Sequence, residues 1–172
     1  CCMTLLYPYS EHLSKLERMI ALSTHSFVLF PSSTAITATE LSAIVSDVKE
    51  KDTEDSLSHT LVIVIDGTWR EARRMRHHPV IKDLPEIQLC GDSLEGYKSK
   101  FVARQKSKIE ERISTLEAVA LLLLELAPSE ASTEATTAQL LFENLDIVMK
   151  QLLLQMGLKE KTNLKRIKAP QR

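Results

Sequence analysis

The chain has 172 residues, of which 44% are apolar and 26% are charged, and its formal net charge is -1 at pH 7. This length suits one domain with one sizeable core, and so ordinary a composition assigns no function by itself. The near-zero net charge excludes a uniformly basic protein, so any affinity for nucleic acid must come from a local basic patch. Cys1, Cys2 and Cys90 offer neither a disulfide framework nor a zinc-binding spacing. We therefore expect a reducing, intracellular setting, either cytoplasmic or nuclear.

The sequence has no pattern typical of a membrane span or a secretory signal. Its longest apolar run, residues 118–126, is interrupted by Glu125 and is too short to cross a bilayer. The first residues lack the basic-then-apolar order of a signal peptide. Because the sequence opens with Cys1 and not with Met, we expect part of the N-terminal region to be missing.

The first third of the chain alternates between helical and extended patterns. Apolar residues at helical spacing predict helices over 9–22 and 37–48, and the apolar run at 26–30 predicts a strand. A polar loop over 49–59 follows. Residues 60–65 are apolar and β-branched without alternation, which is typical of a strand covered on both faces in a parallel sheet.

A helix follows that strand. Thr68 and Glu71 have the spacing of a capping box, in which each residue satisfies a free backbone N–H of the other. Trp69, Ala72 and Met75 share one face of the helix, and aromatic residues at such spacing usually pack in the core. The pattern therefore predicts a capped helix with Trp69 on its buried side.

The rest of the chain continues the alternation. In chain order we expect a strand over 86–90, a basic, loop-rich segment over 92–112, a helix over 114–126, a polar connector over 128–137, a helix over 138–156 and a basic, flexible tail over 159–172. Ser114 and Glu117 form a second capping box, and the helix that they open is apolar nearly all round, which predicts that it is buried. Strands alternating with helices predict an α/β domain with a mainly parallel sheet and helices on both faces.

In such sheets, ligands bind beyond the carboxyl ends of the strands. Asp66 directly follows a strand and stands beside a helix N-terminus, where a carboxylate can accept a proton or bind a substrate amine. The alternative is an aspartate that only shapes the turn. Thr68 can likewise be a helix cap alone, and Trp69 a core residue instead of a surface on which a base stacks.

Basic residues gather between positions 70 and 112, where acidic residues dilute them. Such a patch can contact phosphates, but a solvated helix face with charge pairs explains it equally well. The adjacent His77 and His78 lack a third ligand and predict no metal site. The sequence also lacks GxGxxG, GxxxxGK[ST], GxSxG and HExxH, so familiar nucleotide-binding, hydrolase and metalloprotease classes have no support.

Two motifs resemble the hallmarks of the DTW-domain family. Residues 61–71, LVIVIDGTWRE, are similar to its signature of an apolar strand, Asp-x-Thr-Trp and a helix, and residues 114–118, STLEA, resemble its second motif. Smaller resemblances lie at Leu84-Pro85, at Ser99-x-Phe101-x-x-Arg104 and at Leu29-Phe30-Pro31 with Ala35. Ser32 stands where the family usually has Gly, Lys106 stands where Pro is common, and the usual N-terminal cysteine cluster is absent apart from Cys1-Cys2.

The resemblance implies one domain over residues 1–158, with a SPOUT-like fold and a knot in its C-terminal part. It implies S-adenosylmethionine as co-substrate and tRNA as partner. The implied reaction transfers the 3-amino-3-carboxypropyl group to N3 of a uridine and releases methylthioadenosine. We expect no metal, no membrane association and a monomer.

The resemblance also implies site residues. The expected catalytic residues are Asp66, Thr68 and Trp69. The expected cofactor-binding residues are Pro31, Ser32, Leu89, Cys90, Gly91, Arg112, Ser114, Thr115 and Glu117. The expected RNA-binding residues are Arg70, Arg73, Arg74, Lys100 and Arg104. A planar guanidinium suits the donor carboxylate or a phosphate, and free N–H groups at helix starts favour the carboxylate.

Three alternatives stay open. The first is a related transferase that acts on small-subunit ribosomal RNA. The second is a non-catalytic RNA-binding relative, which the departures at Ser32 and Lys106 keep open. The third is an interaction protein that uses the apolar helix expected over 138–156.

Overall fold

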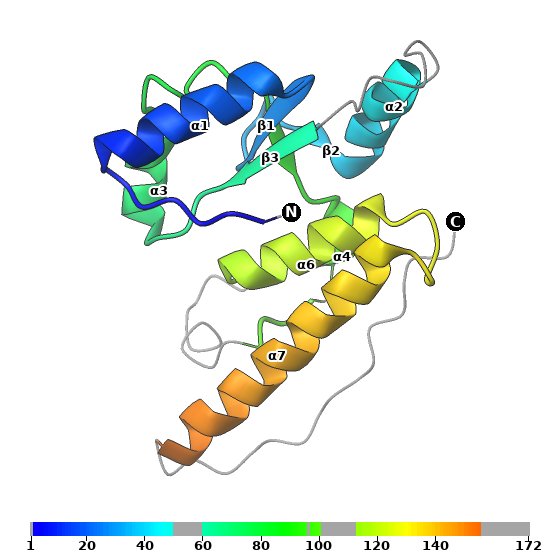
Figure 1. The fold of residues 1–172 in the computed structure, drawn as a ribbon. Coiled ribbons are helices and arrows are strands. Elements are labelled where there is room, and N and C mark those ends of the chain that lie inside the picture. The colour runs from blue at the N-terminus through cyan, green and yellow to red at the C-terminus, as the bar shows by residue number, and fades with distance from the viewer. Residues whose placement is uncertain (1, 50–59, 96, 101–112, 156–172) are drawn as a thin grey trace. The chain divides into compact units, whose positions relative to one another are not determined.

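The structure is a computed structural model that describes residues 2–49, 60–95, 97–100 and 113–155 (Figure 1). The chain divides into two compact units, Cys1–Gln88 and Leu89–Arg172, named here unit 1 and unit 2. Each unit has buried apolar residues of its own.

Unit 1 is built on a four-stranded sheet in the order β2-β4-β1-β3, in which every pairing is parallel. The strands are β1 (His25–Leu29), β2 (Ile36–Thr37), β3 (Thr60–Val64) and β4 (Glu86–Gln88). This confirms the predicted α/β class and the parallel sheet. The two-residue β2 was not predicted, because so short a strand leaves no periodic signal.

The helices of unit 1 fall where the periodicity predicts them, as α1 (Ser10–Leu22), α2 (Ala38–Lys49) and α3 (Trp69–Arg76). Val28 on β1 and Ile87 on β4 are fully buried, so the core is centred on the two inner strands. Leu41 on α2 and Ala72 on α3 are also buried. Helices α2 and α3 therefore contribute apolar residues to the core, whereas α1 has no fully buried residue.

Strand β3 is less buried than the sequence predicts. It is the terminal strand of the sheet in the described part of the chain, its residues are only half-buried, and Val64 is 36% exposed. The prediction of a strand covered on both faces was therefore wrong. An unbroken apolar run is compatible with an inner or a terminal strand, and the sheet order that decides between them is set by distant segments.

Unit 2 is helical in its described part, with α4 (Gly91–Leu94), α6 (Thr115–Leu126) and α7 (Thr133–Gln155). In Figure 1, α6 and α7 lie side by side, and Ala120, Leu121, Ala138 and Phe142 form the core cluster between them. The residues of α6 are buried or half-buried, as the expectation of a buried helix requires, except Leu116, which is 38% exposed. One broad face suffices to bury its apolar residues against α7.

Helix α7 begins at Thr133, within the segment that was expected to be a connector up to residue 137. Ser132 explains the early start, because its hydroxyl accepts a hydrogen bond from the N–H of Ala135 at 3.2 Å. Some apolar side chains of α7 are exposed: Leu140, Ile147, Val148 and Leu154.

Over the described ranges, no helix has both the length and the hydropathy needed to cross a bilayer. The expected tail over 159–172 lies outside the described residues.

Candidate functional site

Asp66 is exposed and lies two residues beyond the end of β3. Its strand pairs in parallel with β1, and Leu29 is aligned with Val64 at the ends of the two strands. The loop that contains Pro31 and Ser32 therefore leaves the sheet at the same carboxyl edge as Asp66. This is the edge at which ligands bind in parallel sheets.

The turn after Asp66 leads into the predicted capping box. The Thr68 hydroxyl accepts from the N–H of Glu71 at 3.4 Å, and the Glu71 carboxylate accepts from the Thr68 N–H at 2.8 Å and from its hydroxyl at 2.6 Å. The hydroxyl bond and then the backbone bond lower the pKa of Glu71. Glu71 is therefore held ionised at the start of α3, and the N–H groups of Thr68 and Glu71 are already engaged.

Trp69 does not pack in the core. It is 49% exposed, and its ring stacks on that of Phe30 with 5.3 Å between the centroids and 3° between the planes. The expectation of a buried Trp69 was wrong, because the core position on this helix face is filled by Ala72. The stacked pair links the start of α3 to the residue that follows β1.

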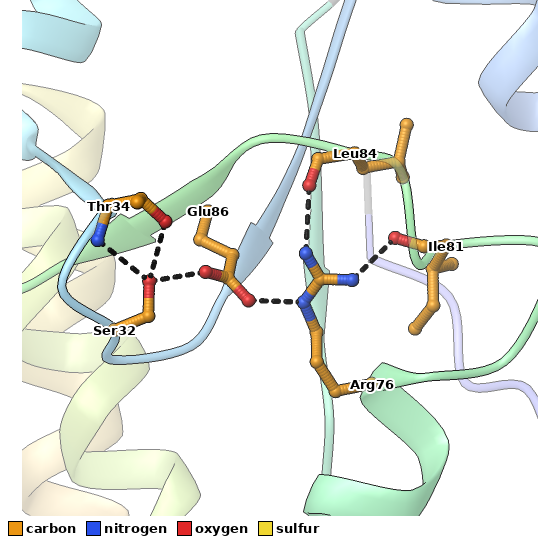
Figure 2. Close-up of polar contacts among 6 residues, drawn as sticks. All are labelled: Ser32, Thr34, Arg76, Ile81, Leu84 and Glu86. Carbon is orange, nitrogen blue, oxygen red and sulfur yellow. Dashed lines mark hydrogen bonds and ion pairs between the residues drawn. The ribbon is translucent and has the colours of Figure 1, made fainter.

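A buried ion pair holds the loop after β1 (Figure 2). Arg76 at the end of α3 donates from Nε to one oxygen of Glu86, and the Ser32 hydroxyl donates to the other oxygen. The remaining nitrogens of Arg76 donate to the carbonyls of Ile81 at 2.8 Å and Leu84 at 3.0 Å. Ser32 thus belongs to a network that joins its loop, β4 and α3.

Burial acts to raise the pKa of Glu86, but the hydrogen bonds from Ser32 and Arg76 and the Arg76 charge outweigh it and lower this pKa. The sequence pattern places Arg76 in the basic run and assigns no role to Glu86. Arg76 is in fact 8% exposed. A signal was present, since Arg76 follows Ala72 by four residues and therefore shares the buried face of α3. A buried Arg on that face and a buried Glu that opens a strand both need a partner.

Helix α6 carries a second buried carboxylate, Glu117, whose exposure is 0%. One oxygen accepts from the Tyr97 hydroxyl at 3.0 Å and the Lys100 N–H at 2.6 Å. The other accepts from the Ser99 hydroxyl at 2.9 Å and the Ser114 N–H at 2.6 Å. The second predicted capping box is thus confirmed, and its glutamate also fixes residues 97–100.

The Glu117 cluster brings together three residues expected at the site, Lys100, Ser114 and Glu117 itself. The Lys100 ammonium pairs with Asp146 at 2.8 Å and lies 5.2 Å from the centre of the Phe142 ring. Burial, followed by the nearby Glu117 charge, raises the pKa of Tyr97 above its ordinary range. These groups are occupied by one another, so this cluster positions its loop and leaves little bonding capacity for a ligand.

Cys90 is fixed by the same helix. Its N–H donates to the two oxygens of Glu125 at 3.0 and 3.2 Å, and burial raises the pKa of that carboxyl despite hydrogen bonds from Ser93 and Cys90. This contact explains why β4 ends at Gln88 and not at Cys90 as predicted: the chain leaves the sheet and begins α4. From the sequence alone, Glu125 is only an interruption of an apolar run.

The other expected site residues differ in their exposure. Pro31, Arg70, Arg73, Arg74 and Gly91 are exposed, whereas Thr115 is half-buried and Leu89 packs against the core cluster of unit 2. Arg104 and Arg112 lie outside the described residues. Within the ranges that the structure covers, no three or more His, Cys, Asp or Glu side chains are grouped to bind a metal ion.

The family model of the DTW domain matches residues 5–153. The chain belongs to the DTW domain family. No curated protein and no solved structure matches it in the corresponding comparisons. Membership in this family is consistent with a role in tRNA modification and is associated with transferase activity.

The family motifs of this DTW domain fall at the points just described. The first motif spans β3, Asp66 and the start of α3, and the second opens α6 with the Glu117 cluster. Ser32 stands where the resemblance leads us to expect Gly, and its hydroxyl donates to Glu86 within the ion-pair network.

We expect Glu86→Gln to lower the free energy of unfolding by about 2–3 kcal/mol at pH 7, because an ionised partner is lost from a buried pair with side chains only 10% and 13% exposed. The pKa of Glu86 is lowered by folding, so its stabilisation is present above the unfolded pKa and is lost as pH falls through the folded pKa. Urea titrations of both proteins between pH 7 and pH 3 measure the difference, which should shrink in acid.

The matched control is Glu17→Gln on α1, where the side chain is exposed. It should change stability by less than about 0.5 kcal/mol at every pH. An equal loss in both variants, or a Glu86→Gln difference that is constant with pH, contradicts the assigned role of the ion pair.

Proposed function

We propose that this DTW domain transfers the 3-amino-3-carboxypropyl group of S-adenosylmethionine to N3 of a uridine in tRNA. The observation that carries the proposal is the exposed carboxylate of Asp66 at the carboxyl edge of a parallel sheet, within the family's Asp-x-Thr-Trp motif. A carboxylate in this place can take the proton of N3 or bind the donor's ammonium group.

In the proposed step, Asp66 accepts the N3 proton, so that the N3 electron pair becomes available for attack. The sulfonium supplies the leaving group: the bond from N3 to the γ-carbon forms while the γ-carbon–sulfur bond breaks, and methylthioadenosine is released. The proton and the electron pair are thereby accounted for without any further reactant. The remaining task of the protein is to hold the γ-carbon in line with N3.

The donor carboxylate needs a cationic or N–H partner. The N–H groups of Thr68 and Ser114 donate to Glu71 and Glu117, so they do not supply it. The exposed guanidinium groups on α3 can bind the donor carboxylate instead. They can also bind phosphates of the tRNA. These groups belong to Arg70, Arg73 and Arg74. Glu117 and Glu125 act in this proposal as positioning residues for the segments at 97–100 and 89–91.

The SPOUT-like knot, the domain span of 1–158, its tail and the monomeric state remain parts of the proposal. So do the roles of Pro31, Ser32 and Thr115 at the donor site and those of Arg104 and Arg112. The knot is testable by limited proteolysis followed by denaturation, since a threaded C-terminal fragment should stay associated longer than an unthreaded one.

The test is to incubate the purified protein with tRNA and a donor labelled in its aminobutyrate part, and to digest the RNA to nucleosides. Mass spectrometry should then find the label in 3-(3-amino-3-carboxypropyl)uridine. A parallel reaction with small-subunit ribosomal RNA tests the first alternative, because label found only there assigns the protein to that substrate. Absence of both label transfer and heat of donor binding favours a non-catalytic RNA-binding protein.

A further inference from the structure

The indole ring of Trp69 is exposed and held in a fixed orientation, and the proton transfer proposed for Asp66 requires neither feature. Trp69 is the only tryptophan of the chain, and it is the first residue of α3. The parallel contact with Phe30 covers part of one face of its ring and fixes the orientation of the ring, while 49% of the residue remains exposed. An oriented aromatic ring with free surface is suited to stacking against another flat ring.

The surroundings of this ring are cationic. Arg70, Arg73 and Arg74 on the same helix are exposed, and a surface hollow at the start of this helix is lined by Thr68, Arg70, Glu71 and Arg74. The carboxylate of Glu71 is directed to the Thr68 hydroxyl and N–H in the capping box. Three exposed guanidinium groups thus lie on the two-turn helix that begins with the exposed ring, in addition to the buried Arg76.

We propose that Trp69, backed by Phe30, is a stacking platform for an unpaired RNA base, with the phosphates next to that base contacting Arg70 and Arg74. Stacked aromatic rings combined with basic side chains are a general means of binding single-stranded nucleic acid. This inference rests on the proposed function, to which it adds the part of the substrate that is recognised: a single strand and not a duplex.

The adenine of the donor is a second flat ring that could stack on Trp69. The number of exposed arginines favours the RNA base, because a strand carries a phosphate on each side of a stacked base, whereas the donor has a single carboxylate to share among three guanidinium groups. The two sources give different results in a binding experiment. Quenching of Trp69 by methylthioadenosine but not by RNA would overturn the assignment to RNA.

Because Trp69 is the only tryptophan, its fluorescence reports directly on this position. We expect a single-stranded uridine oligonucleotide to quench it in a saturable way, since a base stacked on indole quenches its emission. A duplex of equal length should quench much less, and inorganic polyphosphate should compete for binding without quenching. Equal quenching by all three, or none by the oligonucleotide, would contradict the platform.

Substitution tests the same point without the fluorophore. Trp69→Leu should weaken binding of a dye-labelled oligonucleotide about tenfold, measured by fluorescence anisotropy, whereas Trp69→Phe should recover most of the affinity. The control is Tyr9→Leu, which removes another exposed aromatic side chain and should leave the affinity for the oligonucleotide unchanged. Tyr9 is the N-cap residue of α1 and is 63% exposed. Circular dichroism verifies that each variant is folded. Unchanged affinity in folded Trp69→Leu sinks the proposal.

Together, the quenching, affinity and label-transfer measurements distinguish a failure of the stacking platform from a failure of the proposed transferase reaction. Oligonucleotide quenching without any label transfer supports the platform and counts against the proposed reaction. Label transfer without quenching and with full affinity in Trp69→Leu supports the reaction and overturns the platform.

Discussion

Glu117→Ala is expected to lower the free energy of unfolding of unit 2 by on the order of 3–5 kcal/mol. Four groups donate to this carboxylate: the Tyr97 and Ser99 hydroxyls and the N–H groups of Lys100 and Ser114. Alanine removes all four acceptor contacts and half of the capping box, and it leaves a fully buried space lined with unsatisfied donors. A loss of this size is a large fraction of the stability of a typical domain.

Guanidinium titrations monitored by circular dichroism measure the loss. Glu130→Ala is the matched control, because it removes the same side chain from an exposed position in the same unit, and it should cost less than about 0.5 kcal/mol. Glu117→Gln should be intermediate, since it keeps one acceptor oxygen but points an amide N–H₂ toward two donors. A Glu117→Ala loss below about 1 kcal/mol would mean that water or rearranged side chains satisfy the donors.

Local signals in the sequence predicted the local parts of the fold. Both capping boxes, at Thr68 and at Ser114, form with the predicted partners, and the helices that they open begin where expected. These motifs work because a helix start needs only residues within one turn of the chain. The long strands were found for the same reason, as their apolar runs are continuous.

Features that depend on distant segments were missed. The position of β3 at the end of the sheet, the pairing of Arg76 with Glu86 and the contact between Glu125 and Cys90 each join residues far apart along the chain, or are set by such residues. In the last two cases a charged side chain in an apolar or strand context gave a signal. Such a group needs a partner when buried, but the sequence does not say which one.

At the candidate site, too, the features set by neighbouring residues were predictable and those set by distant residues were not. The exposure of Asp66 after a parallel strand follows from the local pattern and the sheet rule. The exposure of Trp69 could not be predicted, since Phe30, the ring on which it stacks, follows β1 and is distant from Trp69 along the chain. Ser32 was singled out as a departure from the family, yet its partner Glu86 lies 54 residues away.

Asp66→Asn is expected to reduce label transfer to tRNA by about 10²–10⁴-fold, the range that general-base catalysis contributes. Asparagine has nearly the same shape but cannot take the N3 proton at neutral pH. Because Asp66 is exposed, the substitution should leave stability within about 0.5 kcal/mol of wild type, so that lost activity is not a consequence of unfolding. The control is Asp83→Asn, whose side chain is 86% exposed, and its transfer rate should match wild type.

The same variant distinguishes the two roles open to Asp66. If the carboxylate accepts the proton, Asp66→Asn slows transfer at saturating donor while calorimetry gives an unchanged Kd for S-adenosylmethionine. If it binds the donor's ammonium group, the Kd rises, and high donor concentration restores much of the rate. Undiminished transfer at every donor concentration would remove Asp66 from the reaction, because neither role survives loss of the charge. The carboxyl edge of the sheet would then have to supply the proton acceptor from another residue.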